Sequence, residues 1–139
     1  MMRHLAVAAV LLTPSAGLTD PITLIDPAAF AWETTAEGVA FAPLHGDRFQ
    51  GAYQAMVRLP ARTVSPPHVK SASMFGVLLQ GEMIHYAGDQ DPETAQKIGP
   101  GAFYSIPGGL GHVSACVSAG PCIAYLSQDA AFDFVPVTP

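Results

Sequence analysis

Two histidines and a lysine are the side chains of this chain best suited to chemistry. His68 follows a Ser-Pro-Pro run, and His112 follows a turn that contains Pro107 and two glycines. Imidazoles bind transition metals and transfer protons near neutral pH. Lys70 lies two residues after His68, and desolvation in a partly apolar cavity would lower the pKa of its amine. It is then either a base or carbonyl-reactive amine, a cation for an anionic ligand, or a rim residue that reaches water.

The spacing of the first group predicts a shared face. Residues at positions i, i+2 and i+6 of a strand point the same way, so His68, Lys70 and Met74 are expected to face one interior. His112 would enter from a facing strand. We expect Tyr104 and Arg58 to assist in ligand binding, Arg58 either as a carboxylate anchor or as a rim residue.

The elements that must hold these residues are predicted to be short strands. The chain has 139 residues, enough for one domain, with 13 Gly and 13 Pro. Apolar alternation between these turn residues, without a long helical pattern, predicts an all-β sandwich or barrel. The six basic side chains are scattered, so no patch suited to nucleic acid can be drawn.

Within this pattern the chain resembles the cupin family. The family's second motif, G-x5-P-x-G-x2-H-x3-N, is matched at four positions, namely Gly101, Pro107, Gly109 and His112, with Cys116 in place of asparagine. The first motif, G-x5-H-x-H-x3,4-E-x6-G, is matched only at His68 and Gly81. Arg62, Lys70 and Met74 replace its first glycine, second histidine and glutamate. The resemblance covers residues of about 50–128 and implies a double-stranded β-helix, the cupin jelly-roll barrel.

The resemblance also implies a metal site that this chain has altered. Cupins with all four ligands hold iron, manganese, nickel or zinc. Here His68 and His112 are kept, while a lysine ammonium repels a divalent ion and a thioether is a poor ligand for the harder ions. If a metal is bound, a third ligand must come from elsewhere; the candidates are His85, Tyr104, Glu82 and Cys116. Otherwise His85 is expected to be a surface or structural residue.

Three functions follow. The first is a module that binds a small, anionic or carbonyl-bearing molecule through a degenerate metal site. The second is a metal-dependent dioxygenase, isomerase or lyase that uses His68, His112 and a third ligand. The third is a metal-free isomerase or cyclase in which His68, Lys70 and His112 act as acids and bases. The chain most resembles small ChrR-like or DUF4437-type bacterial cupins, through residues 65–68 and 75–82. Cupins commonly pair through sheet edges, so a homodimer is expected by resemblance.

The first seventeen residues are expected to be an export signal. Arg3 precedes an apolar run over residues 5–12, and small residues follow at 15–17. The run is shorter than the about 20 residues that span a bilayer. Cleavage would leave a single domain over residues 18–139, with no membrane attachment, in the periplasm or outside the cell. Cys116 and Cys122 flank a five-residue linker and are expected either to form a disulfide or to be separate core residues.

Overall fold

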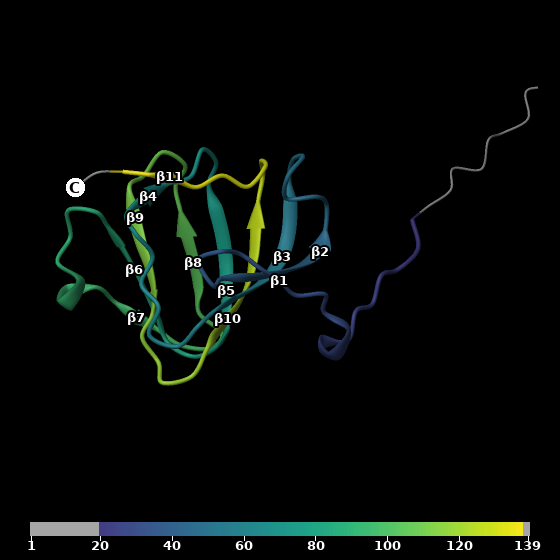
Figure 1. Cartoon of the computed structure of the whole chain (residues 1–139), viewed down its shortest axis with the longest axis horizontal. Helices are drawn as coiled ribbons and strands as arrows, with labels where there is room; N and C mark the ends of the chain where they lie inside the picture. Colours follow the sequence, from purple (N-terminus) through teal and green to yellow (C-terminus); the bar gives the residue numbers. More distant parts are fainter. Residues whose placement is uncertain (1–19, 138–139) are drawn as a thin grey trace, which may run out of the picture.

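Two antiparallel sheets enclose the interior of this protein (Figure 1). The structure is a computed structural model that describes residues 20–137; the expected export signal at 1–17 lies outside the described residues. The six-stranded sheet has the order β1 (Glu33–Thr34), β2 (Ala40–His45), β3 (Tyr53–Leu59), β10 (Cys122–Gln128), β5 (Met74–Gln80) and β8 (Phe103–Ile106). The five-stranded sheet has the order β11 (Val135–Pro136), β4 (His68–Val69), β9 (His112–Cys116), β6 (Met83–Ala87) and β7 (Lys97–Ile98). The predicted all-β double-stranded β-helix is confirmed.

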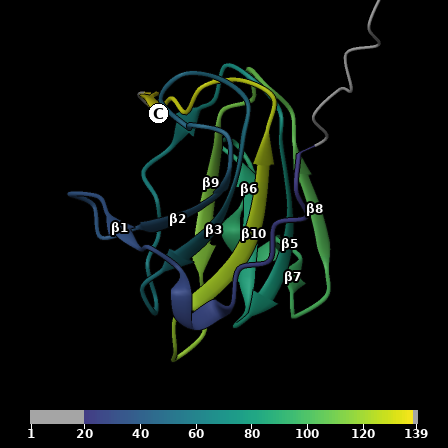
Figure 2. The same ribbon diagram turned by 90° about the vertical axis from the view of Figure 1, so that its right-hand side faces the viewer.

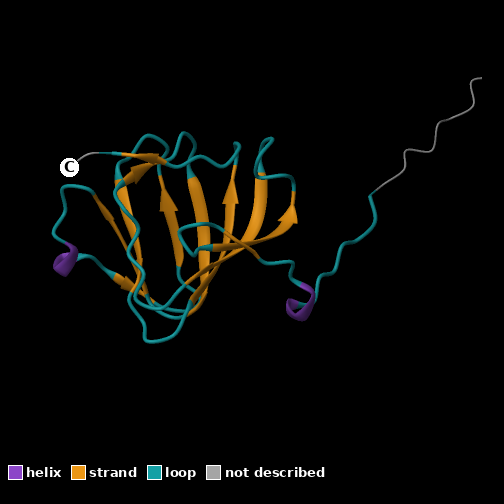
Figure 3. Cartoon of the chain, viewed as in Figure 1, coloured by secondary structure: helices purple, strands orange, loops and turns teal. Residues whose placement is uncertain are grey.

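The two sheets lie face to face. Figure 2 views the six-stranded sheet with β9 and β6 of the other sheet behind it. Only two short 3-10 helices interrupt the strands of the described part, η1 (Pro27–Ala29) and η2 (Pro92–Thr94) (Figure 3). η1 is capped by Asp26, whose carboxylate accepts a hydrogen bond from Ala28 N at 2.8 Å. No helix within residues 20–137 has the length and hydrophobicity needed to cross a bilayer.

Alternation along the central strands decides which residues face the interior. In β3 the inward positions, Tyr53, Ala55, Val57 and Leu59, are buried, and Arg58 lies on the opposite face. β10 pairs with β3 along its whole length and contributes Ala124 and Leu126 to the same core. Period-2 alternation thus places one apolar face of each strand inside the barrel.

The segment after His68 differs from expectation. The face predicted for His68, Lys70 and Met74 requires one continuous strand over residues 68–74, but β4 ends at Val69 and β5 begins at Met74. Between them the chain crosses from the five-stranded to the six-stranded sheet, and the carbonyl of Lys70 accepts a hydrogen bond from Gly109 N at 2.8 Å. Gly109 has a φ of 80°, a conformation that favours glycine. The pairing with this turn ends β4 and redirects the chain.

The β9–β10 hairpin carries a disulfide. Cys116 ends β9 and Cys122 begins β10, with 5.7 Å between their Cα atoms and a bond between their sulfurs. Both cysteines are almost completely buried. Of the two alternatives, a disulfide or two separate core residues, the structure has the disulfide.

Candidate functional site

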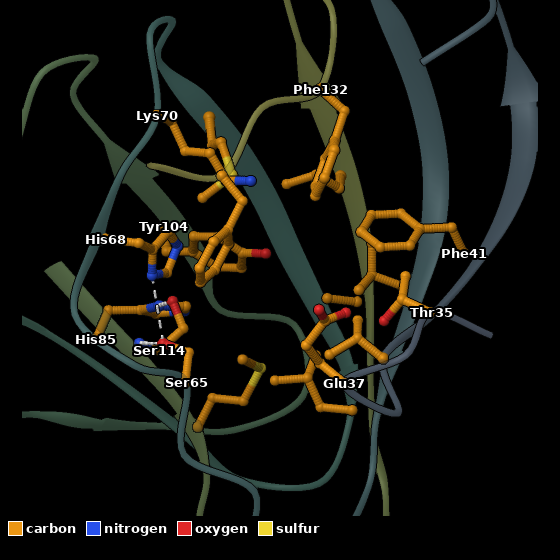
Figure 4. A pocket seen from close by; sticks show the side chains of 18 residues that line it. Thr35, Glu37, Phe41, Ser65, His68, Lys70, His85, Tyr104, Ser114 and Phe132 are labelled. Atoms are coloured by element: carbon orange, nitrogen blue, oxygen red, sulfur yellow. Dashed lines mark hydrogen bonds between the residues drawn. The ribbon is translucent and has the colours of Figure 1, made fainter. Parts of the chain in front are cut away.

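A largely apolar cavity of about 330 Å³ opens inside the barrel. It is lined by eighteen residues: Thr35, Glu37, Val39, Phe41, Val57, Leu59, Ser65, His68, Lys70, Met74, Met83, His85, Tyr104, Ser114, Ala124, Leu126, Phe132 and Phe134. Figure 4 shows the polar side chains His68, His85 and Lys70 together on one side. Thr35, Glu37 and Phe41 lie on the other side. The cavity therefore has a cluster of nitrogen groups on one side of a largely apolar wall, with the carboxylate of Glu37 on the other side.

His68 is a buried, neutral imidazole. Its Nδ1 donates a hydrogen bond to the carbonyl of Pro66 at 2.9 Å, so the lone pair is on Nε2. The ring stacks on Phe134 with 4.1 Å between centroids. Burial, above all, lowers the pKa of His68 to about 4. At neutral pH this side chain is therefore a hydrogen-bond acceptor toward its surroundings.

His112 is the strand partner of His68, with 4.3 Å between their ring centroids. Its Nδ1 donates to the carbonyl of Leu110 at 3.0 Å, which leaves a lone pair on a buried Nε2 that has no hydrogen-bond partner among the described residues. Burial lowers the pKa of His112 as well. His112 does not belong to the residues that line the cavity, so its contact with the site runs through His68.

His85 lies on the cavity wall rather than on the surface. Residues 83 and 85 of β6 share a face, and both line the cavity. His85 Nδ1 is 2.9 Å from Ser114 Oγ, and its ring lies 4.3 Å from that of Tyr104. Burial lowers the pKa of His85 to about 4. Of the two readings made from the sequence, the surface position is wrong; the signal for the inward one was the two-residue spacing from Met83.

Lys70 places a primary amine on the same wall although only 4% of its surface is exposed. Its Nζ donates a hydrogen bond to the backbone carbonyl of Asp133. The nitrogen also lies 3.7 Å from the ring centroid of Phe132 and 5.3 Å from that of Phe134. Burial lowers the pKa of Lys70 to about 8, against a smaller opposing effect of Asp133. Lys70 is thus enclosed by the 132–134 segment and does not reach water at a rim.

The remaining expected ligand-binding residues separate into two groups. Met74 and Tyr104 line the cavity as expected. Arg58 does not: its guanidinium lies 4.5 Å from the ring centroid of Trp32, on the outer face of β3. The expectation was wrong because the neighbouring residues Val57 and Leu59 take the inward positions, and alternate residues of a strand point to opposite faces.

The residues present do not fit the metal site of a four-ligand cupin. His68 and His112 offer two Nε2 lone pairs, but Lys70 and Met74 occupy the other two positions. Of the suggested third ligands, His85 and Tyr104 line the cavity, whereas Cys116 is in the disulfide and Glu82 is exposed outside the cavity. No group of three His, Cys, Asp or Glu side chains within residues 20–137 is arranged to hold an ion.

Several lining residues were not predicted from the sequence. Phe132 and Phe134 come from the segment after β10, and Thr35 and Glu37 come from the turn between β1 and β2. Both segments lie outside the span of the motif resemblance, and neither has a pattern that indicates a site. Ser114, by contrast, is two residues after His112 in β9, so alternation could have found it.

Comparisons with known proteins agree with this architecture. A family model described as the ChrR cupin-like domain matches residues 21–130. A search of curated proteins finds no match. Among solved structures, the polyketide cyclase RemF from Streptomyces resistomycificus superposes with a TM-score of 0.68 at 17% identity, over 86% of this chain and 87% of that one.

Two further structures share the fold. Rhodobacter sphaeroides SigE in complex with the anti-sigma ChrR gives a TM-score of 0.57 at 20% identity, over 75% of this chain and 51% of that one. Recombinant oxalate oxidase in complex with glycolate gives 0.56 at 19% identity, over 73% and 56%. At these identities the structural likeness shows the fold alone, whereas the family model covers most of the chain. The chain therefore belongs to the ChrR cupin-like domain family, within the cupin superfamily.

Proposed function

We propose that this protein binds a small organic molecule with an apolar body and one polar end inside its barrel. The observation that carries the proposal is the cavity of about 330 Å³, whose largely apolar wall carries the polar side chains of His68, His85 and Lys70 together on one side. Ligand cavities of proteins are typically hundreds of cubic ångströms in volume and mostly apolar, with a few polar groups that orient the ligand. His68 and Lys70 supply an acceptor and a donor at that polar end.

The test uses three naphthalene compounds that share a body and differ at one end: 2-naphthalenemethanol, 2-naphthoate and 2-naphthaldehyde. Isothermal titration at neutral pH is expected to show binding of the alcohol and tighter binding of the carboxylate, because Lys70 is mostly protonated there. Thermal stabilisation by the same compounds provides a second measurement. Absence of binding by all three to folded protein would overturn the proposal.

A matched pair of variants locates the bound compound. Ala124 lines the cavity from β10, and Ala124→Leu is expected to weaken binding of the alcohol at least about tenfold by filling the space. Ala52 is exposed before β3, and Ala52→Leu is expected to leave binding unchanged. Circular dichroism checks that both variants are folded. Equal affinities in the two variants would place the compound outside the barrel.

The metal-dependent alternative has a direct test as well. Metal analysis of the purified protein is expected to find less than one equivalent of any divalent ion, because the donor set lacks two ligands. A stoichiometric metal that is lost in both His68→Ala and His112→Ala would overturn the metal-independent reading.

We also propose that the chain acts after export, in the periplasm or outside the cell. The disulfide between Cys116 and Cys122 supports this, since such bridges persist mainly in oxidising compartments. A homodimer remains a prediction, supported by the exposed side chains of Phe75, Leu79 and Phe103 near the β8 edge of the sheet. Kinship with DUF4437-type proteins likewise remains a prediction.

A further inference from the structure

The amine of Lys70 is a nucleophile that simple ligand binding does not require. Its side chain lines the cavity and is buried, whereas Lys97, the other lysine of the chain, is exposed in β7. A surface role would leave the amine in water, and a packing role would need no nitrogen. A buried primary amine at this position can instead react with a bound molecule.

Lys70 forms no ion pair with a carboxylate among the described residues. The ion pair found within residues 20–137 joins Arg48 and Glu33. The nearest acidic residue, Asp133, offers Lys70 its backbone carbonyl, while its carboxylate accepts a hydrogen bond from Ser71 N at 2.9 Å. The rings of Phe132 and Phe134 cover the amine. A neutral amine satisfies this site fully, since it donates one N–H to the carbonyl and keeps its lone pair.

We propose that Lys70 condenses with the carbonyl group of an aldehyde or ketone bound in the cavity, forming an imine. The inference rests on the proposed function and names the class of its ligand. The lone pair of neutral Nζ forms a C–N bond to the carbonyl carbon, and the carbonyl oxygen takes a proton to give a carbinolamine. Loss of that hydroxyl with the remaining nitrogen proton releases one water and leaves C=N. No oxidant or reductant is consumed.

The cavity wall favours both halves of this step. Apolar side chains exclude water, which favours the condensed product over the hydrated carbonyl. Burial raises the pKa of Tyr104 to about 12, so its phenol remains protonated and supplies a hydrogen-bond donor on the same wall. His68 supplies an acceptor. The lowered pKa of Lys70 supports the geometry: at about pH 7.5 roughly a quarter of its amine is neutral, against roughly one in a thousand for an ordinary lysine.

The experiment traps the imine by reduction. The protein is incubated near neutral pH with 2-naphthaldehyde and sodium cyanoborohydride, and labelled residues are located by peptide mass spectrometry. We expect one naphthylmethyl group at Lys70, added at least about tenfold faster than at Lys97, because more of a buried amine is neutral. Excess 2-naphthalenemethanol is expected to slow the labelling of Lys70 and not that of Lys97.

Two variants complete the design. Lys97→Gln is expected to retain the fast label, and Lys70→Met is expected to lose it. Labelling of wild-type protein at equal rates on Lys70, Lys97 and the N-terminus would overturn the imine. So would an unlabelled Lys70 in protein that still binds the alcohol, an outcome that leaves the proposed function standing. Because labelling is mapped in the wild-type chain, the result does not depend on the folding of Lys70→Met.

Discussion

At the scale of single residues, the burial of Lys70 has an energetic cost for the folded protein. A buried ammonium loses hydration, and here it recovers one carbonyl hydrogen bond and contacts with two aromatic rings. Its pKa falls to about 8 from the ordinary value of 10.5. At neutral pH the buried ammonium therefore lowers the free energy of unfolding, and deprotonation of Lys70 removes this destabilisation.

We therefore expect the stability difference between the wild type and Lys70→Met to depend on pH. Between pH 8 and 10.5 the unfolded chain binds more protons at Lys70 than the folded one, so the stability of the wild type rises with pH through this window. From pH 7 to pH 9.5 the wild type should gain about 1–2 kcal/mol relative to Lys70→Met, a value reduced to allow for water in the cavity. Urea unfolding at both pH values measures the difference. A constant difference between the two proteins would show that Lys70 keeps its ordinary pKa.

The sequence predicted part of the site at this scale. His68 and Met74 were expected to face one interior, and both line the cavity, although they lie in different strands, β4 and β5. Period-2 alternation, applied to Val57, would have placed Arg58 outside. The partners of Lys70 could not be predicted from the sequence, because Asp133 lies 63 residues further along the chain and contacts Lys70 only in the folded protein.

At the scale of elements, the pairing of β5 with β8 shapes the cavity wall. Gly76 and Tyr104 are direct partners in this antiparallel pair. A methyl group at Gly76 would lie 2.2 Å from Cζ of Tyr104 and 2.3 Å from its hydroxyl oxygen. Because Gly76 has no side chain, the ring of Tyr104 can lie across β5, and there it lines the cavity.

Gly76→Ala is accordingly expected to displace Tyr104 and to destabilise the protein by about 1–3 kcal/mol, as in other overpacked cores. Urea unfolding measures this, and titration with 2-naphthalenemethanol shows whether the cavity changes with it. Gly99→Ala is the control, because a methyl group there meets no atom within 4 Å. If the two alanine variants were equally stable, the close approach of Tyr104 would have no energetic consequence.

Other elements show where sequence patterns stop being informative. The five-residue linker between Cys116 and Cys122 was recognised in the sequence, and it joins β9 to β10. The break at residues 70–73 was not predicted, because no proline or glycine marks it and the turn is fixed by a hydrogen bond from the distant Gly109 N. β1 and β2 extend the sheet ahead of the motif-bearing region, and no motif residue marks them.

At the scale of the whole molecule, the barrel keeps three imidazoles uncharged in one interior. Burial lowers the pKa of His68 and of His85 to about 4, and it lowers that of His112. Each unfolded histidine takes up a proton at about pH 6.5, whereas the folded protein resists protonation. Between about pH 6.5 and pH 4 the unfolded chain therefore binds more protons, and the stability of the fold falls as the pH falls.

Removal of one such histidine should reduce the loss of stability between pH 6.5 and pH 4. His85→Gln is expected to lose about 1–2 kcal/mol less than the wild type between pH 6.5 and pH 4, a value that allows for solvent screening in the cavity. His45→Gln, at an exposed position that ends β2, is expected to follow the wild type. Urea midpoints at several pH values measure all three proteins under identical conditions, so carboxylates common to them cancel. Parallel curves for His85→Gln and the wild type would mean that His85 charges freely in the folded state.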